Sequence, residues 1–366
     1  MYWMNDLHVF TTQSAKKIFH NIGLDGSDHC LSSHWRFFYE EDPAIGLPIT
    51  RAEVSAPYSQ EAFERLAHRF TEWFTQNGNR ADFFYTSFTS KLVHLFKYLE
   101  IPIYCQLSFR FDDNHELLPS DAAALRDLLI GLAGSGRLEL SANNRYDAMY
   151  FYYYTGIQPT YIPSTGSYIE KHYNPQSDRV LIGPGRHYSY GTYLMDFIAE
   201  QTRSRFGLNV QTVASAFPDG HSWEKLCECR AMVVIPYAVS SGSFFEYLSM
   251  GIPLFFPSLR LLTEWHCSNY LLVERKPSLK PMCASRMAAV IETMPDPQND
   301  FDRDAVRFWL QYSDWYHWDG VKLFDSLDEL GEMLSHFNNF NQSRKQKNQS
   351  ARDFEGATRA WLNLLK

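Results

Sequence analysis

Residues 231–258 read AMVVIPYAVSSGSFFEYLSMGIPLFFPS, and this stretch decides the fold class. The apolar run 231–236 is typical of a buried strand, and a loop of small residues follows it. A short apolar helix carrying one glutamate, Glu246, is predicted next, ending at Gly251. The apolar run from Leu254 predicts a second strand. Strand, helix and strand in so short a stretch form a parallel βαβ unit, which indicates an α/β protein.

The same alternation of strands and helices extends over most of the chain. In the first half the predicted strands are 1–10, 81–88, 101–109, 138–143 and 159–163, and the predicted helices are 14–23, 59–78, 89–100, 120–134 and 145–156. A second series starts with strand 179–185 and runs through helix 190–207, strand 209–215 and helix 222–230 to the opening stretch. Two such series favour parallel sheets covered by helices on both faces.

The domain organisation follows from the polar linker that separates the two series. We expect an N-terminal Rossmann-like domain over 1–163, a linker over 164–178 and a C-terminal Rossmann-like domain over 179–335. Residues 336–366 complete the chain as a polar stretch, 338–350, and a final helix, 351–366. Two doubly wound domains are expected to face a central cleft, where ligands bind beyond the carboxyl ends of the strands.

Composition excludes several classes of protein. The net charge of −8 over 366 residues argues against nucleic acid as a partner. We find no run of about 20 apolar residues and no signal-like start, so a cytoplasmic chain without a transmembrane segment is expected. Aromatic residues make up 16% of the chain, which suits either sugar stacking or core packing. The six cysteines have no zinc-site spacing and are expected to be free thiols.

The small residues before Glu246 have two interpretations. In the first, Ser243 caps the helix and Glu246 reaches back to its start, which is a capping box. In the second, Ser240, Ser241, Gly242 and Ser243 leave backbone amides free for an anion at the helix N-terminus. Glu246 then accepts hydrogen bonds from ribose hydroxyls, so that the free amides and Glu246 together hold a nucleotide diphosphate.

The segment Glu246-Tyr-Leu-Ser-Met-Gly251-Ile-Pro253 resembles the donor-site signature of GT-B glycosyltransferases. The resemblance implies that Glu246 binds the ribose of a sugar nucleotide and that the preceding loop lies against its diphosphate. It also implies that Arg186, in VLIGPGR at the start of the second series, neutralises the diphosphate. Where retaining members of the best-known branch carry a second glutamate, eight residues earlier, this chain has Ala238.

The acceptor and the catalytic base are expected in the loops of the first half. Asp6 and His8, at the end of the first strand, and His34, in the next loop, are the predicted catalytic bases, because an inverting transfer needs one and histidine titrates near neutrality. His8 in the strand-like segment has a core histidine as its alternative. Further acceptor-side candidates are Asp28, His29, Arg110 and Asp112. Asp28 could instead serve only in a turn, and Arg110 and Asp112 could instead form a surface ion pair.

Two aromatic patches complete the set of candidates. Phe217, in FPDGHSW after a strand of the second series, is expected near the nucleotide base, with an ordinary turn as the alternative. The Trp- and Tyr-rich segment 309–326 is expected mainly in the core rather than beneath a sugar.

These observations predict a glycosyltransferase that moves a sugar from a nucleotide-diphosphate sugar to a carbohydrate-type acceptor. No Asp-x-Asp motif stands where a diphosphate-bound metal would need it, so we expect a metal-independent reaction without a cofactor. The alternatives are a sugar-nucleotide epimerase of the same fold and a non-catalytic module that binds carbohydrate or nucleotide.

Overall fold

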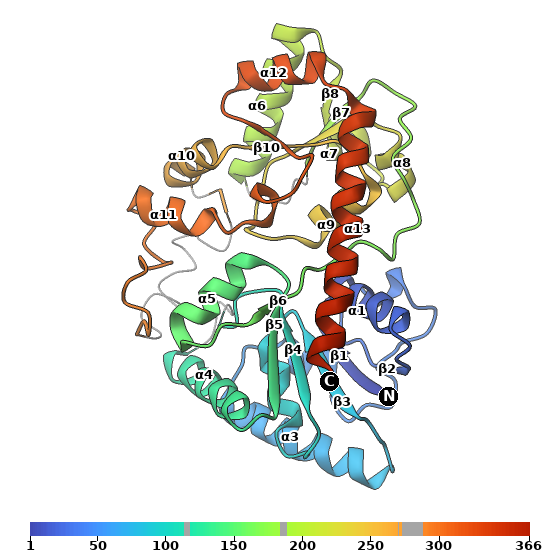
Figure 1. Cartoon of the computed structure of the whole chain (residues 1–366), viewed down its shortest axis with the longest axis vertical. Helices are drawn as coiled ribbons and strands as arrows, with labels where there is room; N and C mark the ends of the chain where they lie inside the picture. Colours follow the sequence, from blue (N-terminus) through green and yellow to red (C-terminus); the bar gives the residue numbers. More distant parts are fainter. Residues whose placement is uncertain (113–117, 184–188, 270, 273–287) are drawn as a thin grey trace. The chain divides into compact units, whose positions relative to one another are not determined.

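The computed structural model describes residues 1–112, 118–183, 189–269, 271–272 and 288–366. The chain forms two compact units. Unit 1 comprises Met1–Ser164, Ser278–Asp296 and Gly356–Lys366, and unit 2 comprises Thr165–Pro277 and Pro297–Glu355. Each unit has its own parallel sheet with helices packed around it (Figure 1). The α/β fold class expected from the sequence is therefore confirmed.

The sheet of unit 1 has six strands in the order β2-β1-β3-β4-β5-β6, and every neighbouring pair is parallel. The strands are β1 (Tyr2–Asp6), β2 (Gly26–Asp28), β3 (Phe83–Ser87), β4 (Ile103–Leu107), β5 (Leu138–Ala142) and β6 (Thr160–Tyr161). The chain builds outward from β1 to β2 on one side and from β3 onward on the other. The direction of winding thus reverses between β1 and β3, which is the topological switch point of this sheet.

The sheet of unit 2 has five parallel strands in the order β11-β10-β9-β7-β8. The strands are β7 (Val180–Gly183), β8 (Val210–Thr212), β9 (Ala231–Val234), β10 (Leu254–Pro257) and β11 (Lys322–Phe324). Counted from its first strand, this sheet repeats the order found in unit 1, and its switch point lies between β7 and β9. Both units therefore follow the same doubly wound plan.

Helices connect successive strands in both units. Those of unit 1 are α1 (Val9–Asn21), η1 (Trp35–Phe37), α2 (Arg51–Ser55), α3 (Gln60–Gln76), η2 (Ser90–Phe96), α4 (Pro119–Gly134) and α5 (Arg145–Thr155). Those of unit 2 are α6 (Ser189–Phe206), α7 (Val213–Ala216), α8 (Trp223–Cys227), α9 (Gly242–Met250), α10 (Leu259–Asn269), α11 (Arg303–Leu310), η5 (Asp314–Tyr316) and α12 (Leu327–His336). Within the described part of the chain, no helix is both long and apolar enough to cross a membrane.

The first predicted strand is too long by four residues. β1 ends at Asp6, and α1 begins at Val9, with His8 as its N-cap residue. The apolar Val9 and Phe10 extend the strand-like pattern in the sequence, but they are buried on the helix. The interpretation of His8 as a residue inside a strand is therefore wrong, and His8 lies in the turn that follows the strand.

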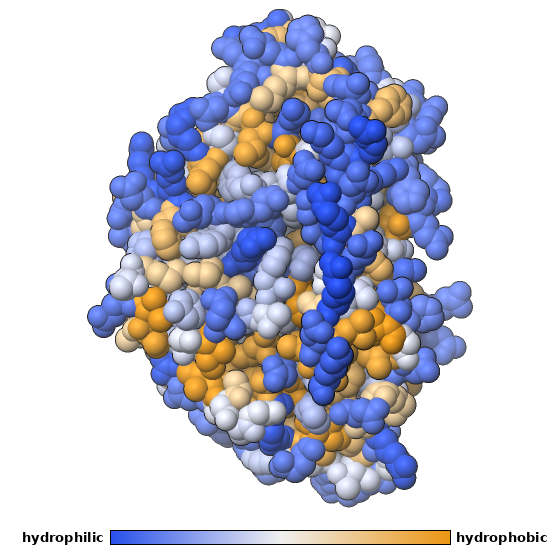
Figure 2. All heavy atoms as spheres, viewed as in Figure 1, coloured by the Kyte–Doolittle hydropathy of each residue, from blue (hydrophilic) through white to orange (hydrophobic). Residues whose placement is uncertain are grey.

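The last helix is longer than predicted. α13 runs from Asn339 to Leu364 and includes the whole polar stretch 338–350 except its first residue. Gln342 and Gln346 are buried on this helix, and Gln342 Nε2 donates to the backbone oxygen of Leu254 in β10 at 2.9 Å. Figure 2 shows a line of hydrophilic residues over α13. The first part of the helix, residues 339–350, buries polar side chains, so no hydrophobic period marked it in the sequence.

Aromatic side chains fill much of both cores. Phe84 and Phe96 stack at 4.3 Å between ring centroids in unit 1, and Phe256 and Trp315 stack at 5.2 Å in unit 2. Trp309 and Trp315, from the segment 309–326, are almost completely buried. The prediction that this segment serves mainly the core is confirmed.

Candidate functional site

The carboxyl edge of each sheet gathers the polar residues that the sequence singled out. In unit 1 the switch point brings Asp6 of β1 opposite Ser87 of β3. In unit 2 it brings Gly183 of β7 opposite Val234 of β9. Ligands of open parallel sheets bind beyond the strand ends at such points, where neighbouring loops diverge to opposite faces.

Helix α9 begins without a capping box. Its N-cap residue is Ser241, whose side chain makes no capping hydrogen bond. Ser241 Oγ instead shares hydrogen bonds of 2.9 Å with Tyr237 Oη and Ser243 Oγ. The backbone N–H groups of Gly242 and Ser243 have no acceptor among the residues described. The capping-box interpretation of Ser243 and Glu246 is therefore wrong, and two donors stand free at the positive end of the helix dipole.

The Glu246 carboxylate is held from outside its own helix. Tyr168, in the segment that opens unit 2, donates its hydroxyl to Glu246 Oε1 at 2.5 Å. Burial raises the pKa of Glu246 above its ordinary value, and hydrogen bonds from the Tyr168 and Trp223 side chains oppose the rise. An ionised carboxylate offers about four acceptor positions, so these bonds leave capacity for further donors such as sugar hydroxyls.

The segment that carries Tyr168 packs directly on α9. A Cβ atom placed on Gly166 would lie 2.9 Å from Glu246 Cα and 2.8 Å from Ser249 Cβ. Only glycine permits this approach of two backbones, because any side chain would collide with main-chain atoms. Gly251 ends α9 with φ of 76°, the left-handed conformation that the sequence predicted for it. One glycine thus lets a second segment pack on the middle of the helix, and the other ends it.

Three other donor-side candidates have different surroundings. Ser240 is half-buried in the loop before α9. Phe217 is the residue at which α7 ends, and the guanidinium of Arg179 and the ammonium of Lys225 lie 5.8 and 5.9 Å from its ring centroid. A ring flanked by cations suits an electron-rich or anionic neighbour. Arg186 lies outside the described residues.

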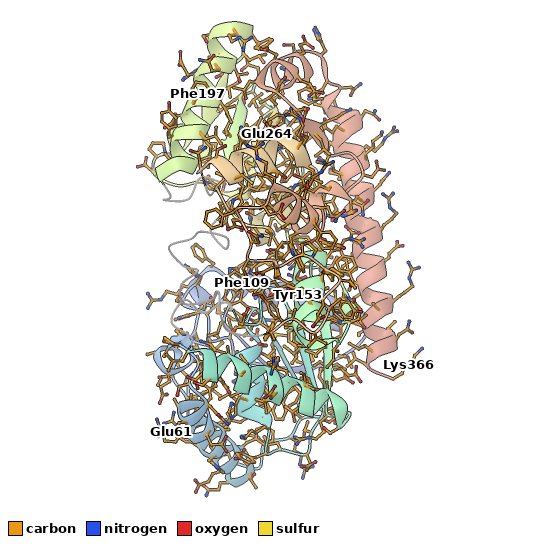
Figure 3. All side chains as sticks on the ribbon, turned by 90° about the vertical axis from the view of Figure 1, so that its left-hand side faces the viewer. Glu61, Phe109, Tyr153, Phe197, Glu264 and Lys366 are labelled. Atoms are coloured by element: carbon orange, nitrogen blue, oxygen red, sulfur yellow. The ribbon has the colours of Figure 1, made fainter. Side chains whose placement is uncertain are left out.

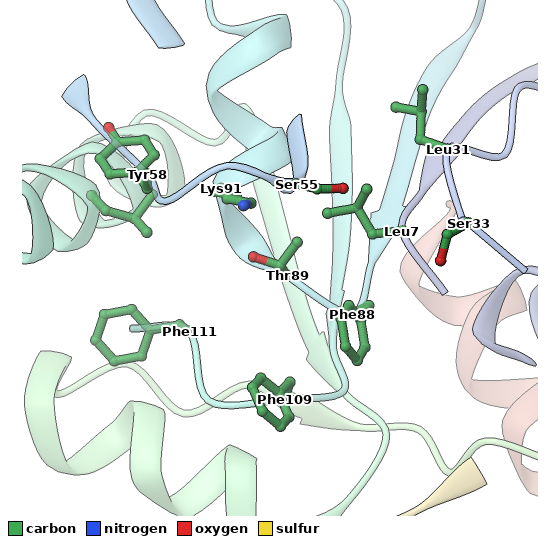
Figure 4. A pocket seen from close by; sticks show the side chains of 11 residues that line it. Leu7, Leu31, Ser33, Ser55, Tyr58, Phe88, Thr89, Lys91, Phe109 and Phe111 are labelled. Atoms are coloured by element: carbon green, nitrogen blue, oxygen red, sulfur yellow. The ribbon is translucent and has the colours of Figure 1, made fainter. Parts of the chain in front are cut away.

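Unit 1 contains a pocket of about 230 Å³ at the carboxyl edge of its sheet. Its wall comes from the loops after β1 to β4 and from the helices beside them: Leu7, Leu31, Ser33, Ser55, Tyr58, Phe88, Thr89, Lys91, Phe109, Phe111 and Leu125. Figure 4 shows the three phenylalanines on one side as drawn, and Tyr58, Ser55 and Lys91 on the other. The size suits a single ring with a short substituent, since whole drug-sized ligands occupy roughly 300–1,000 Å³.

Lys91 is the charged residue of this wall. It is only 6% exposed, and its Nζ donates to the backbone oxygen of Ala56 at 2.7 Å. No carboxylate of the described chain lies within ion-pair distance of it. Burial lowers the pKa of Lys91 to about 8, because the interior disfavours the ammonium form.

Phe88 has a left-handed backbone in the same wall. Its φ is 63°, and no other described residue besides glycine has a positive φ. The turn is fixed by its neighbours: the Phe88 amide donates to Ser108 Oγ at 2.8 Å, and the Thr89 amide donates to the Ser87 oxygen at 2.7 Å. Bulky residues adopt this conformation at a cost of about 1–2 kcal/mol, and such costs concentrate at functional sites.

Asp6 anchors the switch point from below the pocket. It is completely buried, and its Oδ1 accepts from the His8 amide at 2.9 Å. Its Oδ2 accepts from Thr11 Oγ1 at 2.7 Å and from the hydroxyl of Ser87. Burial raises the pKa of Asp6 to about 6 against the opposing effect of these bonds. With every approach closed, Asp6 acts as a positioning residue that ties β1, β3 and α1 together.

His8 lies at the pocket's edge with its ring 5.0 Å from that of Phe88. Its Nδ1 accepts from the Phe10 amide at 3.3 Å, which places the proton of the neutral ring on Nε2. In this state Nε2 carries the proton and has no lone pair with which to accept another. Asp6 touches the backbone of His8 and not its ring.

The remaining histidine and aspartate candidates of the loop after β2 have structural contacts. His34 is exposed at the start of η1, beside Phe37. Asp28 pairs with Lys16 Nζ at 2.9 Å and accepts from the Tyr39 hydroxyl. His29 stacks on Trp3 at 3.9 Å between ring centroids, and burial lowers its pKa. None of the three lines the pocket, although Ser33 in the same loop does.

Arg110 and Asp112 are buried, so the alternative of a surface ion pair is wrong. Arg110 Nη1 lies 3.5 Å from Asp147 Oδ1, and its guanidinium covers the ring of Phe109 at 4.5 Å. Asp112 accepts from the Tyr150 hydroxyl at 3.2 Å. The cluster thus joins the loop after β4 to α5, and it supports Phe109 in the pocket wall.

Sequence reasoning missed Lys91, Tyr58 and the three phenylalanines of the pocket. Lys91 stands in the segment 90–96, whose members are all buried in the fold, but Ser90 and His94 make its sequence pattern too polar to indicate this burial. Nothing in the sequence marked the left-handed backbone of Phe88. Tyr168, the partner of Glu246, was also missed, because it lies 78 positions away in the segment assigned as a linker.

No group of three or more histidine, cysteine, aspartate or glutamate residues suited to a metal ion occurs in the part of the chain that the structure describes.

Comparison with known proteins gives no matching family model and no matching curated protein. Among solved structures, the chain is similar to the glycosyltransferase SnogD from Streptomyces nogalater, at 11% identity and a TM-score of 0.46 over 99% of this chain and 98% of that one. It is also similar to the glycotransferase of kitacinnamycin, at 11% identity and a TM-score of 0.44 over 100% of this chain and 99% of that one.

A third similar structure is the spinosyn rhamnosyltransferase SpnG complexed with thymidine diphosphate, at 12% identity and a TM-score of 0.41 over 96% of each chain. We draw no functional conclusion from these likenesses, whose scores all lie below 0.5.

Proposed function

We propose that the chain is a glycosyltransferase that takes a sugar from a nucleotide-diphosphate sugar and passes it to a carbohydrate-type acceptor. The observation that carries the proposal is the start of α9, where two backbone amides are free and Glu246 is not used as a cap. A helix N-terminus with free amides suits a diphosphate, and a carboxylate one turn further suits ribose hydroxyls. This is the arrangement implied by the resemblance of residues 246–253 to the GT-B signature.

On the donor side each residue has a distinct role in the proposal. The amides of Gly242 and Ser243 bind the diphosphate, with the hydroxyls of Ser240, Ser241 and Ser243 beside them. Glu246, oriented by Tyr168, binds the ribose. Phe217 contacts the base and Arg186 neutralises the diphosphate, as the sequence analysis expected. The helix dipole supplies positive charge where a metal ion otherwise would, so the proposed reaction needs none.

On the acceptor side the pocket of unit 1 holds the acceptor. Of the three predicted bases we place His8 at the reacting hydroxyl, because its ring lies beside Phe88, whereas Asp6 is sealed and His34 is exposed. To accept a proton at Nε2, His8 must carry its own proton on Nδ1. The hydrogen bond from the Phe10 amide must therefore open when the acceptor binds, while Asp6 keeps the backbone of His8 in place.

The test is release of nucleoside diphosphate from a panel of nucleotide sugars, with and without acceptors, in the presence of a chelator. We expect release that depends on an acceptor, continues in chelator and falls by about 10²–10⁴-fold in His8→Ala if His8 is the base. Conversion of the donor without any acceptor would favour the epimerase instead. Turnover lost in chelator and restored by manganese would contradict metal independence.

A further inference from the structure

We propose that the pocket of unit 1 binds a ligand consisting of one ring and one anionic substituent, with the ring against the phenylalanines and the anion on Lys91 Nζ. As a binding site it stands on its own residues; as the acceptor site it rests on the proposed function. The two are separable, because binding is measured here without any nucleotide sugar.

The first step is the state of Lys91. A buried ammonium without a counter-charge is costly, and buried charges in proteins are normally paired. Lys91 Nζ has one hydrogen bond, to Ala56 O at 2.7 Å, and an ammonium has three donors. Glu64 of the neighbouring helix α3 already binds Lys97 and His94 Nε2, the latter at 3.0 Å. Among the residues that the structure describes, the positive charge is therefore buried without an anionic partner.

The second step is the shape and character of the wall. Phe88 and Phe109 stack at 5.4 Å between centroids with planes 20° apart, and Phe111 and Tyr58 continue the aromatic lining. Tyr58 is held by His94 Nδ1 at 2.8 Å, so its hydroxyl is already committed. A space of about 230 Å³ with these aromatic faces has room for a single flat or puckered ring.

The third step is the strained backbone of Phe88. Its φ of 63° is maintained by hydrogen bonds to Ser87 and Ser108, and it brings the Phe88 ring into the pocket beside Phe109. A strained aromatic residue and an unpaired buried cation in one small pocket are independent observations. Both carry an energetic cost, and such costs concentrate at functional sites.

The experiment measures binding of four probes by calorimetry at fixed ionic strength: 4-hydroxybenzoate, phenyl phosphate, and the neutral 4-hydroxybenzamide and phenol. If the pocket prefers a carboxylate, we expect 4-hydroxybenzoate to bind about tenfold to a hundredfold more tightly than 4-hydroxybenzamide, which is the range for a charge-assisted hydrogen bond. A phosphate ligand predicts the same preference for phenyl phosphate over phenol. Either result supports the proposal and identifies which anion the pocket prefers.

Three variants locate the interaction. Lys91→Met should abolish the preference for the charged probe, while Lys17→Met, at an exposed lysine, should leave it unchanged. Phe109→Ala should weaken charged and neutral probes alike, because it removes part of the ring's contact surface. The comparison of charged with neutral probe on the unmodified protein needs no variant and is independent of any folding defect. The proposal is overturned if no anionic probe binds, if charged and neutral probes bind equally, or if Lys91→Met keeps the preference.

Discussion

Phe88 lies in the wall of the unit 1 pocket and has a left-handed backbone conformation that glycine would adopt more easily. In Phe88→Gly and Phe88→Ala the ring is lost equally, so their difference reports the cost of the left-handed conformation. We expect Phe88→Gly to have the larger free energy of unfolding, by about 0.5–1 kcal/mol, after the greater flexibility of glycine in the unfolded chain is included. Chemical denaturation of both variants measures this. Equal stabilities would mean that the strain at a φ of 63° does not exceed the flexibility cost of glycine.

The raised pKa of Asp6 predicts a specific dependence of the free energy of unfolding on pH. Its pKa rises from an ordinary 3.8 to about 6 on folding, so the folded protein holds this proton more tightly than the unfolded chain. Stability contributed by the protonated carboxyl is present below pH 4 and is lost as pH rises to about 6, by about 3 kcal/mol in all.

Asp6→Asn, which mimics the protonated form, removes this dependence. We expect the unfolding free energy of Asp6→Asn, relative to the unmodified protein, to increase between pH 4 and 6 and to stay constant above. Denaturation curves at several pH values, with the exposed Asp127→Asn as control, provide the measurement. A flat difference across this range would show that the carboxyl is not raised in pKa.

At the scale of single residues, some candidate site residues could be predicted from the sequence and others could not, for a physical reason. Glu246 could be predicted as a candidate from the loop before α9 and Gly251 after it, although its hydrogen-bond partner Tyr168 lies 78 positions away. Lys91 and Tyr168 could not, because their significance comes from contacts made only in the folded chain. Likewise, Arg110 and Asp112 follow a strand in a pattern that fits a surface, and only tertiary packing buries them.

At the scale of elements, the contact of Gly166 with α9 connects backbone packing to the donor site. In Gly166→Ala the new methyl group meets Glu246 Cα at 2.9 Å and the oxygen of Phe245 at 2.9 Å, and neither can move independently of the helix. We expect the 165–168 segment to shift, the bond from Tyr168 to Glu246 to weaken and nucleotide affinity to fall by tenfold or more.

The matched control is Gly131→Ala in α4, where a Cβ atom meets nothing within 4 Å. An exposed glycine within a helix costs roughly 0.5–1 kcal/mol relative to alanine, so this variant should be more stable than the unmodified protein and should bind nucleotide normally. Calorimetric titration of both variants gives the comparison. Normal nucleotide affinity in Gly166→Ala would separate the segment from the donor site.

Most strands and the helices between them could be predicted, because buried parallel strands and capped helices leave local signals. Ser59 caps α3 and Gly78 follows its end with φ of 65°, as the sequence indicated. The errors have a common cause. The helical start at Val9 and the polar α13 are both set by what the residues pack against, and not by the period of their hydrophobicity.

For the whole molecule, α13 contributes to both units: residues up to Glu355 belong to unit 2 and those from Gly356 to unit 1. Trp361, near its end, is completely buried against Phe19 and Tyr85, with ring centroids at 5.2 and 5.7 Å. We expect Trp361→Ala to destabilise unit 1 by about 3–5 kcal/mol. Hydrogen exchange should then accelerate in β1 and β3 and much less in β9. Equal acceleration in both units would contradict their description as separate cores.

The α/β class and the two series of strands could be read from the sequence, but the order of strands within each sheet could not. That order depends on which side of the first strand each crossover takes, and no residue records the choice. It matters for function, because the shared order places a switch point between β1 and β3 and another between β7 and β9. The pocket lies at the first, and the start of α9 follows β9 at the second.

The central claim is that the start of α9 binds a nucleoside diphosphate through Glu246. The measurement that tests it most directly is thermal unfolding with UDP, GDP, CMP, ADP or dTDP, for the unmodified protein, Glu246→Ala and Glu264→Ala. The last variant removes a half-exposed carboxylate from α10 of the same unit (Figure 3). A ligand that binds only the folded state raises the melting temperature by mass action.

We predict that one of these nucleotides raises the melting temperature of the unmodified protein and of Glu264→Ala by several degrees, and that of Glu246→Ala little or not at all. No increase with any nucleotide, or an equal increase in Glu246→Ala, would contradict the claim.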